Sequence, residues 1–102
     1  MKLKNPLRTL LRGPPKIPNG LFTYRGSGEF SGLALQLRVE PSGEGLLVIN
    51  ANTVLYLNKT ATAHAYFFMR GLPTGEAVKE MRRLYKIDLE TAKRDHEELL
   101  YN

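Results

Sequence analysis

The chain has 102 residues, a length that fits one small domain. It is 42% apolar and 25% charged, which is typical of a globular sequence. It has no cysteine, so disulfides, thiolate zinc sites, cysteine-ligated iron–sulfur clusters and cysteine nucleophiles are excluded. The net charge of +5 comes from residues 1–30, which have six Lys or Arg residues against one acid, whereas residues 31–102 have nine of each. A basic segment beside a neutral domain is weaker evidence for nucleic-acid binding than a basic folded surface.

Residues 1–20 are predicted to form a basic N-terminal arm, and residues 21–102 a single domain. The arm has four prolines, which prevent regular structure beyond one short turn. It lacks the apolar middle and the cleavage site of a signal peptide. No apolar run approaches the roughly 20 residues that a membrane span needs. We therefore expect a cytoplasmic protein that does not enter a membrane.

The next part of the chain has the pattern of a small antiparallel sheet. Apolar residues alternate with polar ones over residues 33–39, which is the period of a half-buried strand. A turn and a second strand over 46–50 follow, and the Asn-rich turn at 50–52 leads into a third strand, Thr53–Leu57. Residues 21–24 could add a fourth strand. The sequence predicts a three-stranded antiparallel meander with one apolar face.

Helical spacing begins at Asn58, which is a good N-cap residue, and the first helix is expected to stop at Gly71. Thr74 is expected to cap a second helix and Asp88 a third. The third helix has an apolar stripe with a gap at His96, where we expect a half-buried histidine. The order of elements predicts an α+β fold, in which a three-stranded sheet is followed by three helices that pack on its apolar face.

Catalytic motifs are absent from this pattern. His64 and His96 lie on different predicted helices, and neither is accompanied by the spacing of a metal site. The glycine-rich stretch 26–32 has no P-loop lysine and precedes no predicted helix. We therefore expect a protein that is not an enzyme and that binds no metal or other cofactor in this chain.

Two kinds of binding surface remain. Three helices beside a β-hairpin suggest a winged-helix module that binds nucleic acid, but residues 88–102 have five acids and two bases, a net charge of −3 that phosphates would repel. The alternative is an edge strand of the sheet, which can accept an extended peptide as an additional strand. The same edge could also pair with a second copy of the chain, so a homodimer is a third interpretation.

Residues 46–100 resemble the PqqD-like family, the recognition elements of pathways for ribosomally synthesised and post-translationally modified peptides. The resemblance covers a little over half of the chain. It rests on a strand ending in "YLN", an alanine-bearing helix closed by Gly71, the stretch "TGEAVKEMRRLYKID", and a third helix with Asp95 and Leu99 in the positions of the family's "D…L". One departure is His96, where the family usually has an apolar residue. The part of the chain that precedes residue 46 is similar to the N-terminal extension of certain radical SAM proteins.

The resemblance implies that the leader of a precursor peptide binds as an added strand on Thr53–Leu57, in a groove against the third helix. Carried over by position, the strand residues of this site are Thr53, Val54, Leu55, Tyr56 and Leu57. The helix residues are Lys93, Arg94, Glu97, Leu100 and Tyr101.

The resemblance also implies a radical SAM enzyme as the partner, in cis or in trans. The chain stops inside a periodic helix at "EELLYN". We interpret it as an N-terminal domain separated from such an enzyme, or as a natural terminus that frays. S-adenosylmethionine and an iron–sulfur cluster would then belong to the enzyme and not to this chain.

Overall fold

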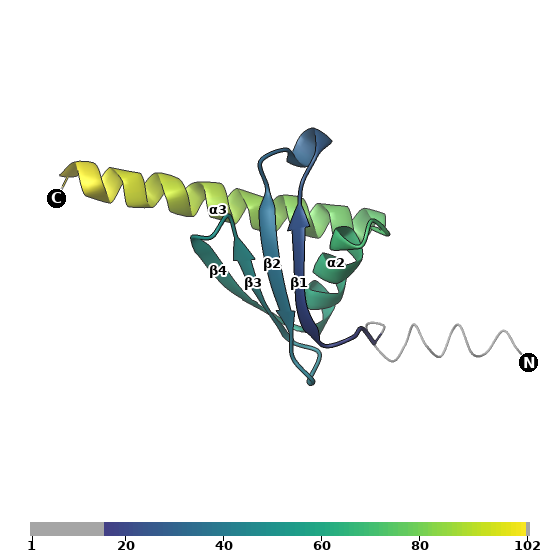
Figure 1. The fold of residues 1–102 in the computed structure, drawn as a ribbon. Coiled ribbons are helices and arrows are strands. Elements are labelled where there is room, and N and C mark those ends of the chain that lie inside the picture. Colours follow the sequence, from purple (N-terminus) through teal and green to yellow (C-terminus); the bar gives the residue numbers. More distant parts are fainter. Residues whose placement is uncertain (1–15, 102) are drawn as a thin grey trace, which may run out of the picture.

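A computed structural model describes residues 16–101 (Figure 1). Residues 1–15 of the expected N-terminal arm lie outside this range. The elements follow in the order β1 (Gly20–Arg25), the short 3-10 helix η1 (Gly28–Phe30), β2 (Ala34–Val39), β3 (Gly45–Ile49), β4 (Thr53–Leu57), α2 (Lys59–Met69) and α3 (Gly75–Tyr101). Within residues 16–101, neither α-helix has a stretch that is long and apolar enough to cross a membrane.

The four strands form one antiparallel meander in the order β1-β2-β3-β4. This confirms the three expected strands, and it shows that the possible fourth strand, at residues 21–24, is part of β1. Each strand pairs with the next along the chain, with Leu37 opposite both Phe22 of β1 and Leu47 of β3. The sheet therefore ends at β1 on one side and at β4 on the other.

The core lies between one face of the sheet and the two α-helices (Figure 1). Leu37, Leu47 and Ile49 point into it and are fully buried, together with Ala77 and Met81 of α3. This confirms the expectation that the helices cover the apolar face of the sheet. Burial of that face is also what stabilises α2, which has only 11 residues. The opposite face is uncovered within the described residues, and it carries the exposed side chains of Leu21, Val54 and Tyr56.

The turn between β3 and β4 has two residues in the left-handed region, Asn50 with φ 52° and Ala51 with φ 64°. The backbone N–H of Asn52 donates to the carbonyl of Ile49 at 3.1 Å and closes the turn. Two consecutive positive φ angles are typical of the type I′ turn, whose twist matches that of the strands it joins. The prediction of a tight turn at residues 50–52 is confirmed.

The ends of the first helix also agree with the sequence. The side-chain oxygen of Asn58 accepts a hydrogen bond from the N–H of Ala61 at 2.8 Å, which makes Asn58 the N-cap of α2. Gly71 follows with φ 75°, and the N–H of Leu72 donates a hydrogen bond to the carbonyl of Phe67 at 2.9 Å. Thr74 Oγ1 accepts from the N–H of Ala77 at 3.1 Å at the start of α3.

The prediction of three helices was wrong, because the second and third expected helices are one continuous helix, α3. Asp88, expected to cap a new helix, lies inside α3 and is only 3% exposed. Its carboxylate accepts hydrogen bonds from Thr53 Oγ1 and, at 3.0 Å, from Asn50 Nδ2. The β3–β4 turn, and not the backbone of a first helical turn, supplies the partners of this acid. No glycine or proline occurs within residues 76–101 to end the helix.

A smaller expectation was also wrong. His96 was expected to be half-buried, but it is exposed because α3 has left the core by that point. The glycine-rich loop after β1 contains η1, whose Phe30 is buried against Phe68 with ring centroids 4.9 Å apart. An aromatic side chain inside a glycine-rich loop is the signal for this contact.

Candidate functional site

The free edge of β4 is the feature of the fold that offers unpaired backbone groups. The N–H of Asn50 donates to the carbonyl of Ala34, so the backbone groups of Asn50 and, by alternation, those of Val48 point toward β2. The groups of Leu47 and Ile49 then point toward β4 and pair with Leu55 and Thr53. It follows that the N–H and C=O groups of Val54 and Tyr56 point away from β3.

No strand within residues 16–101 pairs with this outer side of β4. The segment that precedes β1 leads to the opposite edge of the sheet, where β1 pairs with β2. An additional strand could therefore hydrogen-bond to Val54 and Tyr56 without displacing any described part of the chain.

The five expected strand residues divide between the two faces of the sheet. Thr53 and Leu57 are buried, and Leu55 is half-buried against the core, so these three face the helices. Val54 and Tyr56 face the uncovered side, where the Tyr56 side chain is 87% exposed. Only Val54 and Tyr56 combine outward backbone groups with exposed side chains.

The C-terminal half of α3 continues past the β4 edge (Figure 1). The helix is held at the start of β4 by the hydrogen bond between Thr53 and Asp88, and Leu89, the next residue, is already 56% exposed. The projecting half of α3 therefore begins beside the start of β4.

The expected helix residues lie on this projecting half. Lys93, Arg94 and Glu97 are exposed, and the side chains of Leu100 and Tyr101 lie outside the described set. At about 100° per residue, Lys93 lies about 140° around the helix from Asp88, which faces the sheet. The sheet-facing side continues after Asp88 through Thr91, Ala92 and Asp95, which sequence reasoning did not include in the site.

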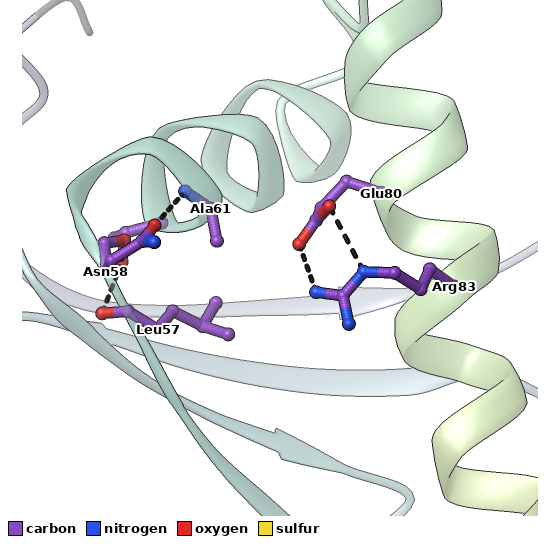
Figure 2. Close-up of polar contacts among 6 residues, drawn as sticks. Leu57, Asn58, Ala61, Glu80 and Arg83 are labelled. Carbon is purple, nitrogen blue, oxygen red and sulfur yellow. Dashed lines mark hydrogen bonds and ion pairs between the residues drawn. The ribbon is translucent and has the colours of Figure 1, made fainter. Parts of the chain in front are cut away.

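A hollow of about 310 Å³ lies at the C-terminal end of β4, between the strand, the start of α2 and α3. We call it the edge cavity. Figure 2 shows that the side chains of Glu80 and Arg83 meet in the space between α2 and α3, facing the strand end at Leu57 and Asn58. The cavity is lined by Tyr56, Leu57, Asn58, Thr60, Ala61, His64, Glu80 and Arg83.

Glu80 and Arg83 form a two-point ion pair within the edge cavity. Arg83 Nη2 lies 2.6 Å from Glu80 Oε2, and Arg83 Nε lies 3.4 Å from Glu80 Oε1. The hydrogen bonds to Glu80 raise the pKa of Arg83, so the guanidinium remains charged. The pair holds the arginine in place at the mouth of the cavity.

Sequence reasoning placed none of Thr60, His64, Glu80 and Arg83 in a site. The spacing of Glu80 and Arg83 predicts an ion pair on one helix face, but such pairs are common on solvated helices. Only the packing of α2 against α3 brings this face to the end of β4.

Among residues 16–97, whose side chains the structure describes, no three or more His, Asp, Glu or Cys side chains form a group that could hold a metal ion. His64 lines the edge cavity, whereas His96 lies on the projecting half of α3. A comparison of the chain with protein-family models, curated proteins and solved structures found no match.

Proposed function

We propose that the domain is a non-catalytic peptide-binding module that accepts an extended peptide as a fifth strand on β4. The observation that carries the proposal is the open edge, where the backbone groups of Val54 and Tyr56 point away from β3 beside the projecting half of α3. Backbone hydrogen bonds would supply affinity, and contacts with alternate side chains would supply selectivity.

The edge of β4 is already positioned relative to the helices, so the domain would not need to rearrange when a peptide binds. The N-cap at Asn58 joins β4 to α2 with no intervening loop, and Asp88 ties α3 to the start of the same strand. Both ends of β4 are therefore held relative to the helices before a peptide arrives. A rigid site reduces the ordering cost of association, although the peptide must still lose its own conformational freedom.

The resemblance of residues 46–100 to the PqqD-like family supports a specific peptide class. We propose the leader of a ribosomally synthesised precursor peptide as the ligand. The catalytic partner would be a radical SAM enzyme, in cis or in trans, that supplies S-adenosylmethionine and its iron–sulfur cluster. This part of the proposal rests on the resemblance, and the peptide-binding edge stands independently of it.

The winged-helix alternative has weaker support. The described end of α3 carries Glu90, Asp95 and Glu97 against Lys93 and Arg94, and all five are exposed. A recognition helix for nucleic acid would need an excess of positive charge. This alternative predicts binding to duplex DNA with an affinity that falls steeply as salt is raised, and the peptide proposal predicts no such binding.

The test is a selection of random peptides of about ten residues, long enough to span the five residues of β4 and its flanks. The strongest binder is then titrated into the isotope-labelled 102-residue chain and followed by NMR. We expect the largest amide shifts at Val54, Tyr56 and neighbouring residues. Failure to select any binder, or shifts confined to the region around β1, would contradict the proposal.

A proline at residue 54 sharpens the test. Val54→Pro removes the outward N–H, and because that N–H does not bond to β3, the sheet should remain folded. We expect this variant to lose peptide binding. The control, Val54→Thr, keeps the N–H and a β-branched side chain, so it should bind as well as the unmodified chain. Sedimentation of the unmodified chain over a range of concentrations shows whether β4 pairs with its own copy instead.

A further inference from the structure

The edge cavity lies on the path of a peptide bound to β4, so an inference about its ligand rests on the proposed function. Residues that face one another on neighbouring strands point to the same side of the sheet. A peptide residue opposite Leu57 would therefore point toward the helices, as Leu57 does, and its side chain would enter the edge cavity. The volume of about 310 Å³ admits one polar side chain together with several waters of about 30 Å³ each.

The carboxylate and amide oxygens that line this cavity already have partners. Both carboxylate oxygens of Glu80 accept from Arg83, and the side-chain oxygen of Asn58 accepts from the N–H of Ala61. Thr62 Oγ1 donates to the carbonyls of Leu57 and Asn58, at 3.3 and 2.7 Å. A ligand that donates hydrogen bonds to these oxygens would therefore compete with contacts that are already made.

The donors, in contrast, are in excess. Arg83 uses Nε and Nη2 for Glu80, and its Nη1 has no acceptor among residues 16–97, whose side chains the structure describes. The imidazole of His64 and the hydroxyl of Thr60 also have no hydrogen-bond partner in that range. The first turn of α2, which faces the cavity, adds the positive end of a helix dipole.

We infer that the edge cavity binds an acidic side chain of the peptide, with Arg83 and His64 as its donors. Arg83 is the main specificity-determining residue, and Glu80 is a positioning residue that acts by holding the guanidinium. Because the charge of Glu80 is neutralised by Arg83, the ligand carboxylate meets the unoccupied edge of the guanidinium and not a net negative site.

The alternation of side chains extends the inference to a sequence pattern. The peptide residue opposite Leu55 also points toward the helices, and half-buried Leu55 itself offers it an apolar contact. It lies two positions from the residue opposite Leu57. The preferred peptides should therefore contain Asp or Glu two positions from a large apolar residue, and the residue between these two can be of any type.

The experiment uses the strongest peptide from the random-peptide selection, synthesised with Glu, Gln or Lys at the acidic position. With the unmodified chain, we expect the Gln peptide to bind about tenfold more weakly than the Glu peptide, the scale of one charge-assisted hydrogen bond at a partly exposed site. The Lys peptide should bind more weakly still.

Two neighbouring arginines provide a matched pair of variants. In Arg83→Gln the difference between the Glu and Gln peptides should fall to about twofold or less, because the charged donor is gone. In Arg82→Gln the tenfold difference should persist. Arg82 is on the same helix, is similarly exposed and is also ion-paired, but its partner is Glu29, which does not line the cavity.

Equal affinity of the unmodified chain for the Glu and Gln peptides would overturn the inference, and so would a Glu preference that survives in Arg83→Gln. If Val54 and Tyr56 amides still shift in either case, the peptide-binding edge stands and only the acidic specificity fails. Amide shifts that avoid β4 altogether would instead overturn the proposed function.

Discussion

The buried carboxylate of Asp88 should be among the largest single contributors to stability in this domain, and Asp88→Ala tests this. In the folded chain it accepts from Asn50 Nδ2 at 3.0 Å and from Thr53 Oγ1, and Asn50 in turn accepts from the N–H of Ala34 at 2.8 Å. The substitution removes the shared acceptor, so Asn50 Nδ2 loses its partner and Thr53 Oγ1 keeps only its contact with Asn52 Oδ1 at 3.2 Å. A donor left without a partner costs about 1–3 kcal/mol.

The expected loss in the free energy of unfolding is about 2 kcal/mol, because part of the lost hydrogen bonding is offset by relief from burying a charge. For a domain of this size, that corresponds to a fall in Tm of about 8–16 °C. Urea unfolding followed by circular dichroism measures the loss. The control is Asp95→Ala, which removes an exposed acid from the same helix and should change stability by less than about 0.5 kcal/mol.

A double-mutant cycle tests whether the loss of stability comes from the hydrogen bond between Thr53 and Asp88. Thr53→Val removes one donor, and combined with Asp88→Ala it should show an interaction energy of about 1 kcal/mol or more, because the two residues share a hydrogen bond. If Asp88→Ala were as stable as the unmodified chain within about 0.5 kcal/mol, the stabilising role of Asp88 would be refuted, because the network would not hold α3 against the β3–β4 turn.

Three further outcomes are expected. Ala51→Gly should stabilise the chain by about 0.5–1 kcal/mol in urea unfolding, because φ 64° strains alanine and Asn-Gly suits a type I′ turn; a loss of stability would contradict the assigned turn. Gly45→Ala should cost about 1–3 kcal/mol, because the new Cβ would lie 2.8 Å from Cγ2 of Thr62, and an unchanged Tm would show that the helix can shift. The hydrogen bond from Arg82 lowers the pKa of Glu29, so the ion pair contributes to folding stability at neutral pH, and this contribution is lost as the pH falls through the lowered pKa. Arg82→Gln should return the pKa of Glu29 toward 4.5 in an NMR titration. An unchanged pKa would mean that the pair does not form in solution.

Local patterns predicted most of the elements correctly. Alternating apolar residues mark β2, Asn58 and Gly71 mark the two ends of α2, and the positive φ angles occur in the expected Asn-rich turn. These features depend on interactions among residues close in the sequence, such as a side chain that caps its own helix or a turn that closes on itself.

The predictions that were wrong or incomplete depended on residues far apart in the sequence. Asp88 is a residue type that often caps helices, but in the folded chain its carboxylate accepts from Thr53, 35 positions earlier, and from Asn50. Likewise, Arg83 is an ordinary surface cation by its local sequence. The packing of α2 on α3 brings it beside the end of β4 and forms the edge cavity.

The sequence by itself determined an α+β domain with a strand, Thr53–Leu57, that leads directly into a capped helix. Tertiary structure decided that this strand lies at the edge of the sheet, that α3 continues past it, and that Arg83 and His64 line the cavity at its end. The physical reason is that capping and alternation act over a few residues, whereas the partner of a buried acid and the occupant of a sheet edge are set by how distant segments pack.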